Sequence, residues 1–169
     1  MREIVPRDTS RAKFDPLMAV RSDDGSLYAM GRSDAWERPG GKEAGWIWMG
    51  GWALARYDKA NSRQWIVRLP EVCPGLCDIP GGRGVMAGYY RLGHVYHYEP
   101  GGLLIGIAKL GDAAGNQTGW MDNTAALSVN RDPRDGLLDV FGEDSWLNRM
   151  IWYRVDDRNI KTVEGKILQ

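Results

Sequence analysis

The sequence predicts an all-β protein, and two observations carry that prediction. Its 169 residues include 22 Gly, 8 Trp and 7 Tyr but only 2 Phe. Glycine-rich turns between strands rich in Trp and Tyr are typical of β proteins. No long stretch keeps the 3.6-residue apolar period of a helix, whereas short hairpin-like segments recur along the chain. The length is sufficient for one domain with a sizeable core.

The charge balance excludes some partners. Lys plus Arg equals Asp plus Glu, 22 of each, so no net field would attract nucleic acid or an anionic membrane. No stretch approaches 18 consecutive apolar residues, so no membrane-spanning helix is expected. The start, "MREIVPRDTSRAKFDP", is charged and lacks the apolar core of a secretory signal. The cellular location is left open, because a signal could have been removed.

A strand-and-corner pattern occurs twice, about 110 residues apart. Asp-Gly between apolar alternations predicts a hairpin turn, because Gly tolerates a positive φ. In each copy a leucine follows Asp-Gly and a D-[AS]-W triplet follows the strand. The first copy has Asp24-Gly25, then Leu27, and the triplet at 34–36. The second copy has Asp135-Gly136, then Leu138, and the triplet at 144–146.

Three further hairpins share one shape: an apolar strand containing tyrosine, an acidic or Gly-rich turn, and a second strand. They lie at 52–69, 94–110 and 150–167. The middle hairpin is preceded by two more candidate strands, "LCDIP" and "GRGVMAGYYRL". We therefore expect an N-terminal extension, 1–15, and a single domain, 16–169. That domain would hold three four-stranded units, at about 16–69, 76–110 and 125–168.

Repeated units of four antiparallel strands are the signature of β-propeller blades. The segment "DGLLDVFGEDSWLNRMIWYRVDD" resembles NHL-type blades, and "SDDGSLY" is similar to the Asp-box of sialidase-like propellers, with a spacing that differs by one residue. The resemblance covers all three units at the level of the superfamily. It implies a β-propeller-type fold with about three blades per chain.

Three blades do not close a ring, because propellers typically have four to eight. Two large apolar sheet faces would be left in water, which is unfavourable. A second copy could complete a six-bladed ring with two-fold symmetry, or a different subunit could complete it. Alternatively, residues 1–15 and the insert "ERPGGKEAGWIWMGG" could form an irregular fourth blade. We expect a homo-oligomer or a partner chain.

By analogy with propellers, ligands would bind where loops within and between blades meet. These loops are expected at 32–46, 70–82, 91–94, 111–124 and 143–149. Indole rings cover the C–H patches of sugars, while carboxylates, amides and guanidinium groups bind hydroxyls. We therefore expect a glycan ligand. The candidate binding residues are Trp36, Trp120, Asp122, Asn123, Asp144, Trp146 and Arg149.

The two tryptophans at equivalent repeat positions, Trp36 and Trp146, also fit a structural role at the corner of each blade. Trp120, Asp122 and Asn123 have no repeat counterpart, which favours a role in binding.

A His-Tyr-Arg group suggests catalysis. His94, with Tyr90 and Arg91, is similar to the groups that some polysaccharide lyases use to move a proton beside a uronate. The function expected is thus a carbohydrate-directed propeller that binds a glycan and could cleave it as a lyase or hydrolase. The alternatives are a non-catalytic protein- or sugar-binding scaffold and a segment of a larger propeller.

No metal or cofactor is expected. His94 and His97 are three residues apart and would face opposite sides of a strand. The sequence has no P-loop, no dinucleotide-binding motif after a strand and no H-E-x-x-H. Cys73 and Cys77, in "CPGLC", could be two thiols or a disulfide, and the histidines do not complete a usual zinc spacing.

Overall fold

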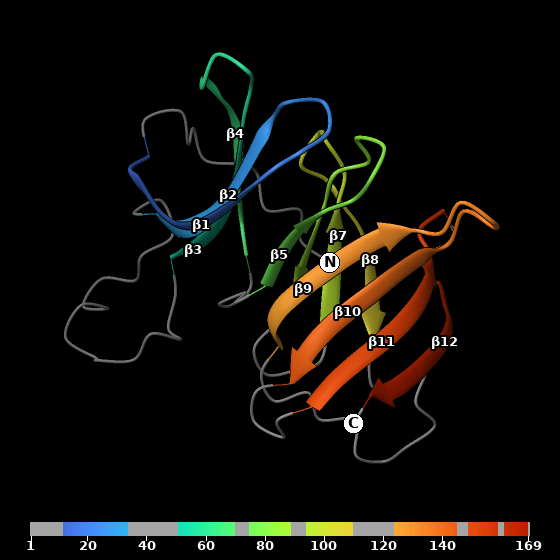
Figure 1. The fold of residues 1–169 in the computed structure, drawn as a ribbon. Helices are drawn as coiled ribbons and strands as arrows, with labels where there is room; N and C mark the ends of the chain where they lie inside the picture. The colour runs from blue at the N-terminus through green and yellow to red at the C-terminus, as the bar shows by residue number, and fades with distance from the viewer. Residues whose placement is uncertain are drawn as a thin grey trace.

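The computed structural model describes residues 12–33, 51–69, 75–88, 94–109, 124–144, 149–158 and 161–168. These residues form twelve strands and no helix, which confirms the all-β prediction. The strands make three four-stranded antiparallel sheets, each following chain order (Figure 1). Within the described part of the chain, no helix is long and apolar enough to cross a membrane.

The N-terminal sheet contains β1 (Phe14–Arg21), β2 (Leu27–Ser33), β3 (Trp52–Tyr57) and β4 (Arg63–Arg68). The middle sheet contains β5 (Gly75–Asp78), β6 (Val85–Gly88), β7 (His94–Tyr98) and β8 (Leu104–Lys109). The C-terminal sheet contains β9 (Thr124–Arg131), β10 (Leu138–Asp144), β11 (Arg149–Asp156) and β12 (Lys161–Leu168). Every neighbouring pair is antiparallel, so each sheet is a simple meander.

The two Asp-Gly turns form as predicted. Gly25 and Gly136 have φ values of 83° and 74°, a conformation that L side chains rarely adopt. The preceding aspartates stabilise both turns in the same way. Asp24 accepts a hydrogen bond from the backbone N–H two residues ahead at 2.7 Å, and Asp135 does so at 3.0 Å.

A second repeated feature was not visible in the sequence. The third strand of every sheet slips its register against the fourth strand at the same point. The slips fall at Arg56/Tyr57, His97/Tyr98 and Arg154/Val155. A bulge bends and twists a strand locally. The three sheets are therefore structural repeats, including the middle one, which lacks an Asp-Gly turn.

The sheets pack face against face, and the middle sheet is covered on both sides. We call the face that carries Arg56, His97 or Arg154 the forward face of its sheet, and the opposite one the backward face. The forward face of the N-terminal sheet, with Leu54, packs on the backward face of the middle sheet, with Val85. The forward face of the middle sheet packs in turn on the backward face of the C-terminal sheet.

The residues buried between the N-terminal and middle sheets include Tyr28, Met30, Trp52, Leu54, Val85, Ala87, Tyr96 and Tyr98. Those buried between the middle and C-terminal sheets include Met86, Val95, Val129, Leu138, Val140, Ile151, Tyr153 and Val155. The first strands lie next to one another, with β5 in contact with both β1 and β9 (Figure 1).

The backward face of the N-terminal sheet is partly covered by its own chain. Phe14 packs against Ala53, Ala55 and Ile66 on that face. A bulge in β1 between Pro16 and Met18 redirects the strand, and Arg63 on β4 donates a hydrogen bond to the carbonyl of Ala12 at 2.9 Å. Residues 12–16 therefore lie across this face. The face is therefore not wholly open.

Candidate functional site

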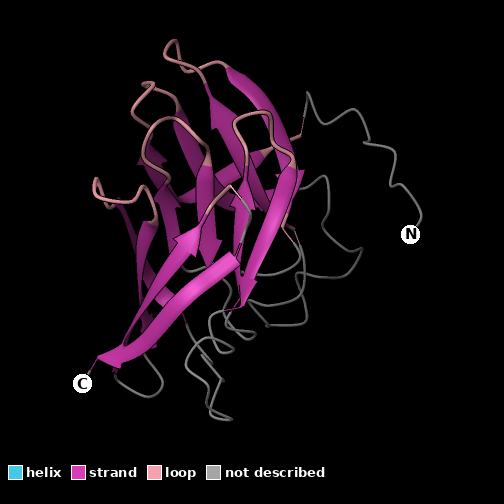
Figure 2. Ribbon diagram, turned by 90° about the vertical axis from the view of Figure 1, so that its right-hand side faces the viewer, coloured by secondary structure: helices cyan, strands magenta, loops and turns pink. Residues whose placement is uncertain are grey.

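The sheets have two distinct ends. The described turns at one end connect the first two strands and the last two strands of each sheet (Figure 2). Hydrogen bonds join the turns of neighbouring sheets: the Gly81 N–H donates to Asp23 at 2.9 Å, and Arg131 donates to the Pro80 carbonyl at 3.2 Å. These contacts bring the turns of all three sheets together at what we call the turn end.

The opposite end, which we call the loop end, is where the candidate ligand residues were expected. The structure places the backbones of three of them there: His94 opens β7, Asp144 ends β10 and Arg149 opens β11. Asp144 and Arg149 are direct partners in the β10–β11 ladder. Their side chains and that of His94 lie outside the described part of the structure.

The other candidates lie outside the described residues altogether. They are Trp36, Tyr90, Arg91, Trp120, Asp122, Asn123 and Trp146. In the sequence, each falls in a segment that connects two strand ends of the loop end. The described part of the structure therefore includes no contact among these side chains, and their role as a binding or catalytic site stays a prediction.

One expected loop is wrong. Residues 70–82 were assigned to a single connection at the loop end, but they contain strand β5 and the start of the turn 79–84. That turn belongs to the turn end. The short strand expected at "LCDIP" overlaps β5, which pairs with β6, so the error lies in the bounds of the loop and not in the strand.

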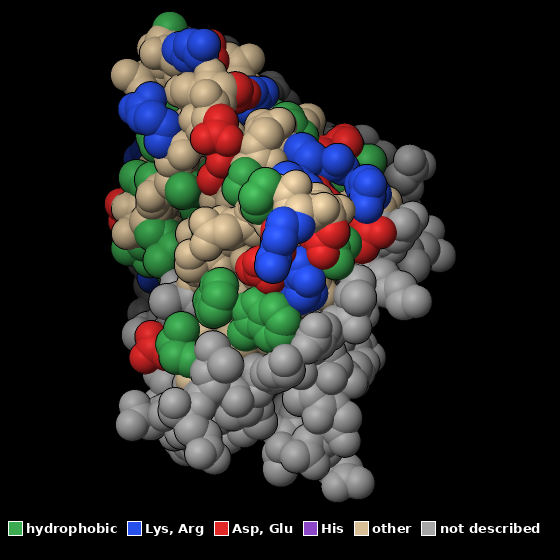
Figure 3. Space-filling model, turned by 45° about the vertical axis from the view of Figure 1, so that its right-hand side comes forward, with side chains coloured by type: hydrophobic (Ala, Val, Ile, Leu, Met, Phe, Trp, Pro, Cys, Tyr) green, Lys and Arg blue, Asp and Glu red, His purple; other side chains and the backbone are tan. Residues whose placement is uncertain are grey.

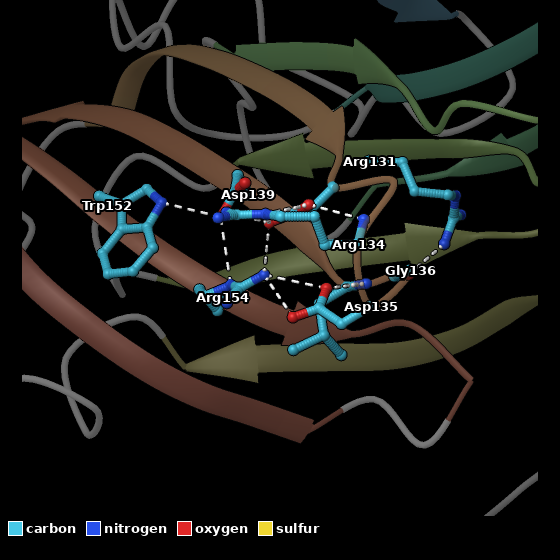
Figure 4. A network of polar contacts seen from close by, with 9 residues as sticks. Arg131, Arg134, Asp135, Gly136, Asp139, Trp152 and Arg154 are labelled. Carbon is cyan, nitrogen blue, oxygen red and sulfur yellow. Dashed lines mark hydrogen bonds and ion pairs between the residues drawn. The ribbon is translucent and has the colours of Figure 1, made fainter.

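The best-described polar cluster lies on the forward face of the C-terminal sheet, towards the turn end (Figure 4). Arg154 is its centre. Arg154 bonds Asp132 at 3.0 Å and Asp135 at 2.7 Å, and its Nε lies 3.4 Å from Asp139. The indole N–H of Trp152 donates to Asp139 at 3.0 Å.

Arg134 completes this cluster by pairing with Asp132 at 2.6 Å. Hydrogen bonds from the side chain and backbone of Arg134 hold the pKa of Asp132 well below its usual range, and the charge of Arg154 adds to the effect. Asp132 is therefore an ionised structural carboxylate and not a proton donor at neutral pH.

A second, buried ion pair joins the middle and C-terminal sheets. Asp157 is only 2 % exposed and lies 3.0 Å from both Arg131 and Arg83. Burial raises the pKa of Asp157, but the hydrogen bond from Arg131 and the charges of both arginines outweigh it and keep the pKa below its usual value. This trio locks two sheets together at the turn end.

Two further titratable side chains, His97 and Cys77, lie on the forward face of the middle sheet. The Nε2 of buried His97 lies 2.9 Å from the Arg83 carbonyl, so the neutral ring donates from Nε2. Burial lowers the pKa of His97. Burial also raises the pKa of the free thiol of Cys77, which makes it a weak nucleophile. The other cysteine, Cys73, lies outside the described residues.

The polar groups of the turn end stabilise the fold. Arginines engage Asp24, Asp132 and Asp157 at this end. Among the described residues, no group of three or more His, Cys, Asp or Glu side chains could hold a metal ion. The ion clusters around Arg154 and Asp157 were not predicted from the sequence. The signal for the first was the run "DPRDG" followed by an arginine in a later strand.

No protein-family model matches the chain, and no curated protein sequence matches it either.

Proposed function

We propose that the three sheets are blades of a β-propeller-type protein whose loop end binds a carbohydrate. Three features support the blade assignment. Each sheet is a four-stranded antiparallel meander with the same third-strand bulge. Successive sheets pack forward face on backward face. The first strands are neighbours, as inner strands around a common axis would be.

One observation favours the loop end as the ligand end. At the opposite end, arginines already engage Asp132, Asp135 and Asp157, which leaves these carboxylates little capacity to bind a ligand. The chain segments attached to the loop end carry the tryptophans, amides and carboxylates that suit sugar rings. Such residues on a rigid β scaffold are reasonable binding groups.

Binding is tested with a panel of neutral and acidic polysaccharides by calorimetry and by retardation in affinity gels. Trp120→Ala and Trp146→Ala should each weaken binding at least about tenfold, equivalent to about 1.4 kcal/mol. Arg134→Ala is the control, because Arg134 is exposed at the turn end. Failure of the whole panel to bind, or equal binding by the tryptophan variants, contradicts the carbohydrate proposal.

Turnover is tested separately, because a binder needs no acid and base while a lyase or hydrolase does. The polysaccharides that bind are incubated with the protein, and new reducing ends or unsaturated uronates are measured. If cleavage is found, His94→Ala should abolish it and retain binding. Binding without cleavage favours the non-catalytic scaffold.

A further inference from the structure

The forward face of the C-terminal sheet repeats positions that are buried elsewhere in the chain. The strand registers place Phe141 at the position of Met30, Trp152 at that of Leu54 and Met150 at that of Trp52. The earlier three side chains are buried between sheets. Phe141 and Trp152 are only half-buried, and Met150 is 42 % exposed. Apolar side chains lie beside the charged cluster on this face (Figure 3).

We propose that this face docks onto the backward face of the N-terminal sheet of a second copy of the chain. The proposal rests on the blade arrangement proposed above, but not on carbohydrate binding. Within one chain, a forward face packs on a backward face twice. Among the described residues, the N-terminal sheet is the one whose backward face carries no other sheet.

An arginine at the turn end is placed to make the new contact. Arg131, at the end of β9, donates to its own turn at Gly136 at 2.8 Å and to the Pro80 carbonyl of the preceding sheet. Arg21 holds the same position at the end of β1 and makes the first of these bonds, to Gly25 at 3.1 Å.

The matching acceptor lies in the C-terminal sheet. The turns 79–84 and 132–137 have the same hydrogen bond, from the N–H of the first residue to the carbonyl of the sixth. Pro133 is therefore the structural equivalent of Pro80. Arg21 of one copy can therefore donate to the Pro133 carbonyl of the other, as Arg131 does to Pro80.

The charges at the same edge are complementary. Inside the chain, Arg83 of one turn pairs with Asp157 of the next sheet. In the proposed contact the equivalent turn is 132–137, and its Asp135 lies one residue before the position equivalent to Arg83. Lys59 takes the position of Asp157, because each follows the aspartate that caps its turn. The signs are reversed but still opposite, which favours this pairing.

The apolar parts also match. Residues 12–16 fill the space above Ala53 and Ala55, whereas the corresponding positions in the C-terminal sheet are Ile151 and Tyr153. Beside this segment Leu17 is 63 % exposed. The proposed contact would cover both Leu17 and Met150, and two such contacts would close a ring of six sheets with two-fold symmetry.

The test measures mass in solution by light scattering and sedimentation over a range of concentrations. The wild type should have twice the 18.9-kDa mass of the chain. Met150→Glu should raise the dimer dissociation constant at least about tenfold, since a charge would enter an apolar contact. Leu103→Glu is the matched control, because Leu103 is exposed in a turn of the middle sheet and should leave the dimer unchanged.

Charge reversal tests the register. Lys59→Glu and Asp135→Lys should each weaken the dimer, and the two together should restore it. In the Asp135 variant, Arg154 keeps Asp132 and Asp139 as partners, but the turn loses the hydrogen bond from the Leu137 N–H to Asp135. Circular dichroism and thermal unfolding therefore check that this variant is folded. In a background without the native cysteines, Arg21→Cys with Pro133→Cys should form a disulfide between copies.

Several results would overturn the proposal. They are a monomer at all concentrations, a dimer indifferent to Met150→Glu, no rescue by the double reversal, or cross-linking of Pro133→Cys to itself, which would mean that two like faces meet. If the protein is a monomer but still binds polysaccharide through Trp120, only the docking proposal is contradicted. If the protein is a dimer but binds no polysaccharide, the docking proposal stands and the carbohydrate proposal is contradicted.

Discussion

At the scale of residues, the most consequential side chain is Asp157. It is buried, and its two arginine partners come from different sheets, Arg83 from the middle one and Arg131 from the C-terminal one. Removing one member of a buried ion pair leaves the others without compensation, which costs more than the pair contributes. Asp157 is therefore expected to matter for stability far more than its neighbour Asp156.

Asp157→Asn should lower the free energy of unfolding by about 3 kcal/mol, at the low end for a buried pair because both guanidinium groups are partly exposed. The matched control is Asp156→Asn, since Asp156 pairs with the exposed Arg158 and such a change should cost under about 1 kcal/mol. Urea titration of both variants measures the difference. Equal losses would show that the trio does not hold the sheets together.

At the scale of elements, the turn 79–84 of the middle sheet shows how close packing restricts which residue can occupy a position. Gly84 and Gly81 lie in the same turn, with φ values of 100° and 91°. A Cβ at Gly84 would collide with the carbonyl of Tyr98, whereas a Cβ at Gly81 would meet nothing within 4 Å. A side chain at either position would meet similar backbone strain, but the space around the two positions differs.

Gly81→Ala should therefore cost about 1–2 kcal/mol, the strain of a left-handed alanine. Gly84→Ala should cost a further 1–3 kcal/mol, roughly the penalty for forcing atoms into a filled space. Thermal or chemical unfolding of the two variants gives the difference directly. Equal destabilisation would mean that β7 moves away from the turn without penalty.

At the scale of the whole molecule, the middle sheet couples the other two. Leu54 lies in the core shared by the N-terminal and middle sheets, and Val140 in the core shared by the middle and C-terminal sheets. Both side chains are fully buried. Because one sheet contributes to both cores, the loss of either core should loosen the other.

Leu54→Ala should cost about 2–5 kcal/mol and Val140→Ala somewhat less, as large-to-small changes in a core do. Both should shift one common transition, with tryptophan fluorescence and far-ultraviolet circular dichroism coinciding. Two separate transitions, each moved by only one substitution, would instead mean that the sheets unfold as independent units.

The sequence was sufficient for the class of fold and for most hairpins. The hairpins expected at 52–69, 94–110 and 150–167 correspond to β3–β4, β7–β8 and β11–β12, and both Asp-Gly turns form. These are local features, set by turn residues and by alternation within a few positions. The carbohydrate-binding and catalytic candidates could not be checked in the same way, because their side chains lie outside the described residues.

What the sequence determined by itself was the local order of strands and turns, because backbone conformation and short-range pairing depend on neighbouring residues. Only the tertiary structure decided the shared bulge, the segment 12–16 across the N-terminal sheet, and the ion clusters of Arg154 and Asp157. The bulge lies within one hairpin, whereas each of the others joins residues from different hairpins. Their partners are chosen by which faces become buried together, and no local pattern records that choice.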